Sequence, residues 1–206
     1  MARRKSSQQW LARQRRDPYV KQAQAAGWRS RAAYKLLELD QRDSILKQGL
    51  CVLDLGAAPG GWSQVAAQRV GSSGRVIAVD VLEMPPLPGV EFLCGDLRDE
   101  HLLAELTALL GTTQVDLVLS DMAPNMSGVQ VVDQARTLVL GELVCDLLDD
   151  LLRPGGTLVL KTFHGEGFDE LMRGLKGRFR RVVSRKPAAS RAQSREVYLV
   201  AQDFRG

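Results

Sequence analysis

Short apolar runs alternate with longer stretches in which apolar residues recur at helical spacing. The runs are bounded by turn residues such as Gly, Pro and Asp, which is typical of buried strands. Strands are predicted at Cys51–Leu55, Arg75–Asp80, Glu91–Cys94, Asp116–Ser120 and Thr157–Phe163. Helices are predicted between them at Ser63–Val70, His101–Leu110 and Asp133–Leu152. This alternation predicts an α/β domain in which helices cover both faces of a parallel sheet.

Both ends of the chain depart from this alternation. Two helices are expected before the first strand, at Asp17–Gly27 and Ser30–Asp43, with Ser30 capping the second. Near the C-terminus, strands at Phe179–Ser184 and Glu196–Ala201 are joined only by a basic loop, which favours an antiparallel hairpin over a crossover. We therefore expect a mostly parallel seven-stranded sheet with an antiparallel C-terminal hairpin strand.

Composition indicates one soluble α/β domain. The 206 residues are 45% hydrophobic and 25% charged, and no apolar run approaches the roughly 18 residues of a membrane span. The first thirty residues are basic and polar, which argues against a secretory signal. Cys51, Cys94 and Cys145 lack the spacing of a disulfide framework or a zinc site. We expect three core thiols in a reducing cytoplasm, and no metal.

Positive charge is concentrated near the two ends. Met1–Arg31 holds nine Lys or Arg and one acid, and Leu171–Arg195 holds nine and no acid, although the whole chain carries only +4. A basic run is often a solvated face, but two such blocks around an acidic middle also suit binding of a polyanion such as nucleic acid.

A glycine-rich loop follows the first predicted strand and opens a helix. Its sequence, Asp54–Trp62, places Gly56, Gly60 and Gly61 around Pro59. Glycines let backbone amides approach a ligand closely. The spacing is not the G-x-G-x-x-G of dinucleotide-binding proteins, so a smaller nucleoside cofactor is favoured over a nicotinamide dinucleotide.

Two acids at later strand ends extend this hypothesis. Asp80 ends the second strand, where an acid can accept hydrogen bonds from ribose hydroxyls, and Asp96 follows the third, where it can accept from an adenine amine. Both can instead cap turns. Trp62 is interpreted as packing against the cofactor, and the alternative, a core residue at the start of the helix, is almost equally favoured.

Five segments carry a resemblance to a known family: Ser30–Leu36, Asp54–Trp62, Ser120–Gly128, Lys161–Asp169 and Ser190–Val197. In this order they resemble the bacterial FtsJ (RrmJ) type of ribosomal RNA large-subunit 2′-O-ribose methyltransferase. The resemblance implies a Rossmann-like methyltransferase fold with S-adenosylmethionine as donor. It implies a uridine ribose in the A-loop of 23S rRNA as target, within the large ribosomal subunit. The chain would act as a monomer, with residues 1–30 as a basic RNA-contacting extension and 31–206 as the methyltransferase domain.

The resemblance also implies which residues form the site. It places Lys35, Asp121, Lys161 and Glu196 together as a catalytic tetrad, although each taken singly is more often a solvated or turn-capping residue. The expected cofactor-binding residues lie mainly in the glycine loop and at the following strand ends: Asp54, Gly56, Pro59, Gly60, Gly61, Trp62, Asp80, Asp96 and Asp121.

The residue types of the tetrad suit methylation of a hydroxyl. A ribose hydroxyl is a poor nucleophile, so the enzyme must align it with the methyl donor and remove one proton. Lys161 is the expected proton acceptor, which requires that burial or the charge of Lys35 favour its neutral form. Asp121 and Glu196 would hold the amines, and Lys35 would orient the hydroxyl.

Other interpretations remain open from the sequence. The same tetrad could methylate another RNA, such as a transfer RNA, and a non-catalytic RNA-binding ribosome-assembly factor could share the fold, although it would be expected to have a damaged tetrad. His164 and the pair Met122 and Met126 are interpreted as packing residues, the pair with possible substrate contact.

Overall fold

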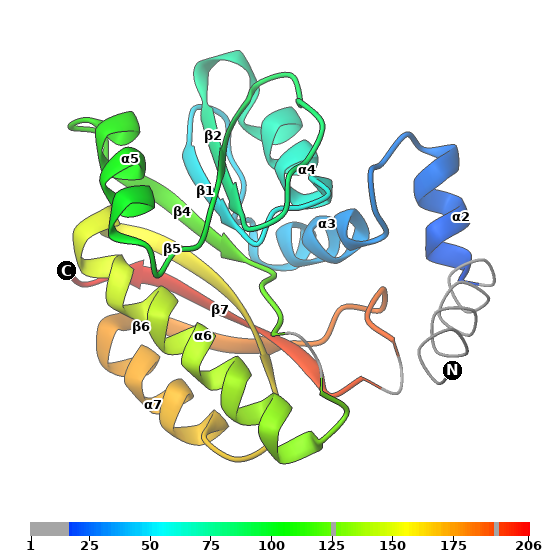
Figure 1. The fold of residues 1–206 in the computed structure, drawn as a ribbon, viewed down its shortest axis with the longest axis vertical. Helices are drawn as coiled ribbons and strands as arrows, with labels where there is room; N and C mark the ends of the chain where they lie inside the picture. The colour runs from blue at the N-terminus through cyan, green and yellow to red at the C-terminus, as the bar shows by residue number, and fades with distance from the viewer. Residues whose placement is uncertain (1–16, 125–126, 192–193) are drawn as a thin grey trace.

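The computed structural model describes residues 17–124, 127–191 and 194–206. Within these ranges the strands are β1 (Cys51–Leu55), β2 (Arg75–Asp80), β3 (Val90–Cys94), β4 (Val115–Ser120), β5 (Leu152–Phe163), β6 (Phe179–Arg185) and β7 (Glu196–Phe204). They form one seven-stranded sheet in the order β3-β2-β1-β4-β5-β7-β6 (Figure 1). The predicted strand number is therefore confirmed.

The direction of the strands also matches the prediction. Strands β1 to β5 pair in parallel, whereas β7 runs antiparallel to both of its neighbours, β5 and β6. The hairpin of β6 and β7 thus folds back so that its second strand inserts beside β5. This insertion places Lys161 of β5 directly opposite Tyr198 of β7.

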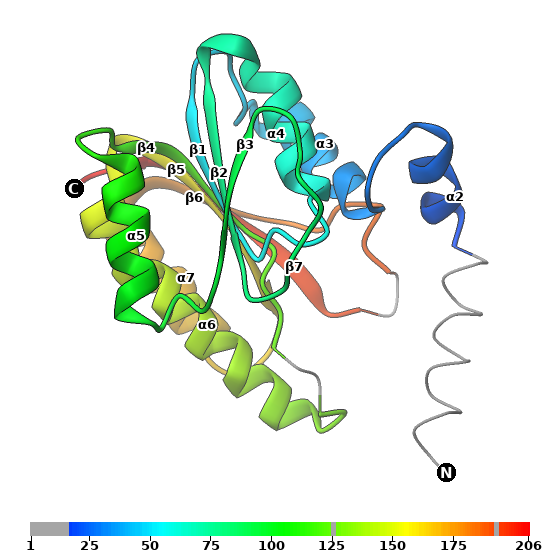
Figure 2. The same ribbon diagram turned by 45° about the horizontal axis from the view of Figure 1, so that its top comes forward.

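Helices cover both faces of the sheet. They are α2 (Pro18–Ala25), α3 (Ala32–Asp43), α4 (Gly61–Val70), α5 (Glu100–Leu110), α6 (Gln130–Leu151) and α7 (Phe168–Arg178), with a short 3₁₀ turn η1 (Gly71–Ser73). The two main apolar clusters separate α3 and α4 on one face from α5, α6 and α7 on the other (Figure 2). None of the described helices is both long and apolar enough to cross a membrane.

Helix α7 was not predicted from the sequence. Phe168, Leu171, Met172 and Leu175 recur at helical spacing and pack on the core. The signal was obscured because Gly165, Gly167, Gly174 and Gly177 interrupt the segment, and glycine weakens a helix interior. The helix makes the crossover that returns the chain from β5 to β6.

Two smaller expectations were wrong. Ser30 does not cap α3, because the cap position is Arg31 and no side chain caps that end. The hydroxyl of Ser30 is instead buried against Gly61, where an added Cβ would lie 2.2 Å from Ser30 Oγ. Cys94 is not a core thiol, because it ends the edge strand β3 and is exposed.

The strand order fixes where a ligand can bind. The chain progresses from β1 to β3 in one direction along the sheet and from β4 onwards in the other. The loops that leave β1 and β4 therefore diverge at the carboxyl ends of neighbouring strands, and open α/β sheets bind ligands in the crevice formed there.

Candidate active site

A cavity of about 850 Å³ lies at this crevice. Its lining includes Gly56 after β1, Asp80 at the end of β2, Asp96 after β3 and Asp121 after β4. Four of the residues expected to bind the cofactor are therefore brought together around one cavity. Met122, interpreted from the sequence as a packing residue with possible substrate contact, also lines it, whereas Met126 falls outside the described residues.

Gly56 must be glycine for two reasons. Its φ angle is +77°, which side chains rarely adopt. A Cβ at this position would also lie 2.6 Å from the Cγ of Met122. The loops after β1 and β4 can therefore approach each other only because this residue has no side chain.

The other expected cofactor residues support the loop rather than line the cavity. Pro59 is exposed, and Gly60, with a φ of 101°, is the residue immediately before α4. Gly61 packs on Ser30. Trp62 is 2% exposed and donates its indole N–H to the carbonyl oxygen of Ala32, 2.8 Å away. Their direct contact with a cofactor stays a prediction.

Asp54 lies beneath the loop, fully buried in β1. One carboxylate oxygen accepts a hydrogen bond of 2.6 Å from Ser63 Oγ, while the other, Oδ1, has no partner within the described part of the chain. Burial raises the pKa of Asp54 to about 7. A buried polar oxygen without a hydrogen-bond partner is energetically costly, so Oδ1 of Asp54 keeps unsatisfied hydrogen-bonding capacity inside β1, two residues before the cavity-lining Gly56.

Asp80 and Asp96 do take part in turns, as their alternative interpretation suggested. The carboxylate of Asp80 accepts from the amides of Ala58 and Leu82, each at 2.8 Å. Asp96 accepts from the backbone and guanidinium of Arg98, and these hydrogen bonds lower the pKa of Asp96 to about 2. A carboxylate has about four lone-pair sites, so both residues keep capacity for a ligand in the cavity they line.

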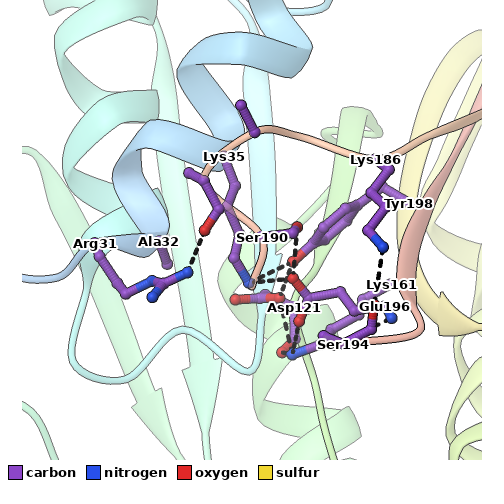
Figure 3. Close-up of polar contacts among 12 residues, drawn as sticks. Arg31, Ala32, Lys35, Asp121, Lys161, Lys186, Ser190, Ser194, Glu196 and Tyr198 are labelled. Atoms are coloured by element: carbon purple, nitrogen blue, oxygen red, sulfur yellow. Dashed lines mark hydrogen bonds and ion pairs between the residues drawn. The ribbon is translucent and has the colours of Figure 1, made fainter. Parts of the chain in front are cut away.

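The side chains of the four tetrad residues converge (Figure 3). Glu196 lies between the two amines, with Lys35 Nζ 2.7 Å from Oε1 and Lys161 Nζ 3.7 Å from Oε2. Lys161 Nζ is also 3.1 Å from Asp121 Oδ1. Asp121 lines the cavity as well, so it connects the two parts of the site.

Tyr198 belongs to this cluster and was missed from the sequence. Its hydroxyl donates to Asp121 Oδ1 at 2.7 Å and accepts from Lys35 Nζ at 2.9 Å. The signal was available, because a residue two positions after Glu196 on a strand shares its face. The side chain is fully buried, and its ring packs against Trp62 at 5.5 Å.

The cluster has a defined electrostatic state. Burial of Glu196 opposes its ionisation, but the charges of Lys35 and Lys161 together outweigh this and lower the pKa of Glu196. Glu196 is therefore a carboxylate at neutral pH. Burial and the charge of Asp121 raise the pKa of Tyr198 well above its usual range, so Tyr198 keeps its proton and serves as a hydrogen-bond donor.

Much of the C-terminal basic block is engaged elsewhere. Arg178 pairs with Asp149, Arg180 with Asp203, and both Arg181 and Arg185 with Asp43. Four of the nine basic residues of this block are thus paired with acids. Residues 1–16 of the N-terminal block lie outside the described residues, so their contact with RNA stays a prediction.

His164 directly follows β5, three residues after Lys161. Its ring packs on Phe168 at a centroid distance of 4.4 Å, which agrees with a structural role. Among the described residues, no group of three or more His, Cys, Asp or Glu is placed to hold a metal ion.

Comparison with known proteins agrees with this geometry. Ribosomal RNA large subunit methyltransferase E of Cellvibrio japonicus is 53% identical over 206 residues, covering 100% of this chain and 98% of its own length. The protein of the same name from Xanthomonas campestris pv. campestris is 56% identical over 204 residues, covering 99% and 97%.

A solved structure and a family comparison give the same result. A Plasmodium falciparum protein provisionally assigned as a ribosomal RNA methyltransferase superposes with a TM-score of 0.79 at 33% identity, covering 87% of this chain and 100% of its own. The sequence pattern of the FtsJ-like methyltransferases matches residues 28–204. The chain therefore belongs to the FtsJ-like methyltransferase family.

Proposed function

We propose that the protein transfers a methyl group from S-adenosylmethionine to a ribose 2′-hydroxyl of 23S rRNA in the large ribosomal subunit. A uridine of the A-loop is the proposed target. The names of the bacterial relatives support ribosomal RNA as the substrate class. These relatives match this chain over almost their whole length, and more than half of the aligned residues are identical. The single observation that carries the chemistry is the contact of the Lys35, Asp121, Lys161 and Glu196 cluster with the cavity through Asp121.

The cavity suits S-adenosylmethionine. Because Gly56 has no side chain, the loops after β1 and β4 approach each other at the lining of the cavity, where a Cβ would collide with Met122. Asp80 and Asp96 stand at successive strand ends, where ribose hydroxyls and an adenine amine would find acceptors. S-adenosylmethionine supplies an activated methyl group on a positively charged sulfur.

The residues of the chain then have separate tasks. Lys161 is the proposed acceptor of the hydroxyl proton, because its amine is the tetrad nitrogen paired with the cavity-lining Asp121. Since a charged ammonium cannot accept a proton, Lys161 must first release its own proton to solvent and then act as the neutral amine. Asp121 and Glu196 hold the amine of Lys161 at two points, which fixes its direction. Lys35, held by Glu196 and Tyr198, is proposed to orient the hydroxyl and stabilise negative charge that develops on its oxygen.

A non-catalytic ribosome-assembly role is less consistent with this arrangement. Burying two lysines beside two carboxylates costs desolvation energy that a binding surface alone does not require. The intact cluster and the glycine loop therefore favour an enzyme.

The test is transfer of labelled methyl groups from S-adenosylmethionine to three substrates: large-subunit particles from cells that lack the enzyme, naked 23S rRNA and transfer RNA. We expect label in 23S rRNA, on ribose after nuclease digestion. Label only in transfer RNA, or on bases, would contradict the proposal. The comparison of particles with naked RNA also shows which form is the substrate.

A further inference from the structure

A second cavity lies on the outer side of α3. It is an open groove of about 1130 Å³, walled by Tyr19 of α2, residues of α3, Arg69 of α4 and Ala189 of the loop between β6 and β7. Helix α2 stands at the side of the domain, across from this loop (Figures 1 and 2). The groove is separate from the cavity at the carboxyl ends of β1 to β4, and the methyl-transfer chemistry makes no use of it.

Two aromatic rings wall the groove. The ring centroids of Tyr19 and Tyr34 are 5.7 Å apart with planes tilted by 52°, and both residues are only half-buried. The guanidinium carbon of Arg31 lies 5.9 Å from the centroid of Tyr19. Partly exposed aromatic rings beside a guanidinium form the kind of surface on which nucleobases stack.

The charges in the groove favour a base over a phosphate. Arg42 pairs with Glu38 at 2.9 Å, and Arg69 lies 3.5 Å from Asp40. These four charges balance, so the groove has no excess positive charge to attract a phosphate. Its carboxylates and guanidiniums can instead accept from and donate to the edge of an uncharged heterocycle.

Two segments that line the groove also carry residues of the candidate cluster or its partners. Tyr34 immediately precedes Lys35 on α3, and Ala189 immediately precedes Ser190, whose hydroxyl donates to Glu196 at 2.8 Å. Arg31 connects α2 with the loop between β6 and β7. Its guanidinium pairs with Asp17, just before α2, and donates a hydrogen bond to the carbonyl oxygen of Ala189 in that loop. Helix α3 and the loop before β7 therefore carry residues of both the groove and the cluster.

We propose that this groove binds a base of the RNA substrate that flanks the methylated nucleotide, stacked against Tyr19 and Tyr34. The inference rests on the proposed function, since it requires RNA at Lys35 and Lys161. Phosphate contacts would position the strand, and the groove would hold one base outside its helix. The competing explanation is that the two rings only pack α2 onto α3.

Methylation kinetics on large-subunit particles test the proposal. Tyr19→Leu and Tyr34→Leu remove the flat ring but keep an apolar side chain, and each should raise KM for the particles about fivefold or more, as loss of one stacked base predicts. Tyr19→Phe and Tyr34→Phe keep the ring and should change KM far less. Leucine variants with the wild-type KM would overturn the base site. A wild-type protein that methylates no particle would instead overturn the proposed function.

A second measurement does not depend on the stability of any variant. Wild-type protein bound to particles is crosslinked with ultraviolet light and digested with trypsin. Nucleotide adducts on the peptides Asp17–Lys21 or Ala32–Lys35, which contain the two tyrosines, would support the proposal. Adducts confined to other peptides would overturn it, and the rings would then be packing residues only.

Discussion

Replacing Lys161 by arginine separates two roles of this residue: placing a positive charge between two carboxylates, and accepting a proton. The amine lies 3.1 Å from Asp121 Oδ1 and 3.7 Å from Glu196 Oε2, with only 10% of the side chain exposed. Arginine keeps the positive charge between these carboxylates but cannot release a proton in a protein. If Lys161 is the proton acceptor, Lys161→Arg should lose as much activity as Lys161→Ala. General-base catalysis contributes about 10²- to 10⁴-fold, so the barrier should rise by about 3 to 5 kcal/mol in both variants.

The assay is single-turnover methyl transfer to large-subunit particles at saturating S-adenosylmethionine. Calorimetry should show nearly unchanged cofactor affinity for both variants, because Lys161 is not among the residues that line the cavity. Lys35→Arg is the matched control, since its proposed role needs charge rather than proton release, and it should retain more activity. Lys161→Arg with turnover within about tenfold of the wild type would refute Lys161 as the base, because that loss is below the usual contribution of one.

Three further predictions address the cofactor, stability and RNA. Asp80→Ala should weaken S-adenosylmethionine binding by about 1 to 3 kcal/mol by calorimetry, and unchanged affinity would leave Asp80 only its turn-capping role. Asp43→Asn should lower the free energy of unfolding by about 2 to 3 kcal/mol, since this fully buried side chain pairs with two partly exposed arginines of β6. Hydrogen bonding to those arginines lowers the pKa of Asp43. The stabilisation is therefore fully present above about pH 4, the pKa of an unfolded Asp, and is lost as the pH falls further. A difference in melting temperature between the wild type and Asp43→Asn that is as large at about pH 3 as at neutral pH would contradict this. Neutralising Arg13, Arg15 and Arg16 should raise KM for RNA and flatten its salt dependence by about 0.7 to 0.9 in log-log slope per lost phosphate contact, whereas an unaltered slope would make the N-terminal block a solvated tail.

The sequence was sufficient to predict the sheet because its signals are local. The bounds of β1 and β2 are those predicted, since each is a short, mainly apolar run followed or ended by a turn residue, Gly56 after β1 and Asp80 in β2. The catalytic tetrad required more, because Lys35 and Glu196 are 161 positions apart and only the family resemblance placed them together. The structure brings these two side chains within 2.7 Å.

What the sequence could not predict depends on non-local packing. Asp43 was read only as the end of a helix, yet it fixes α3 to β6 through Arg181 and Arg185. Likewise, strand alternation places Tyr198 on the same face as Glu196, but only the insertion of β7 beside β5 sets it opposite Lys161. Charge counts likewise cannot show which arginines pair with distant acids, as Arg181 and Arg185 do with Asp43.

The central claim is tested most directly by mapping 2′-O-methyl riboses in RNA from cells that lack the protein and from the same cells carrying either the wild-type chain or Lys161→Ala. We predict that one 2′-O-methyl site, on a uridine of 23S rRNA, is absent without the protein, returns with the wild-type chain and stays absent with the variant. A map identical in all three strains, or a lost site in transfer RNA instead, would contradict the account.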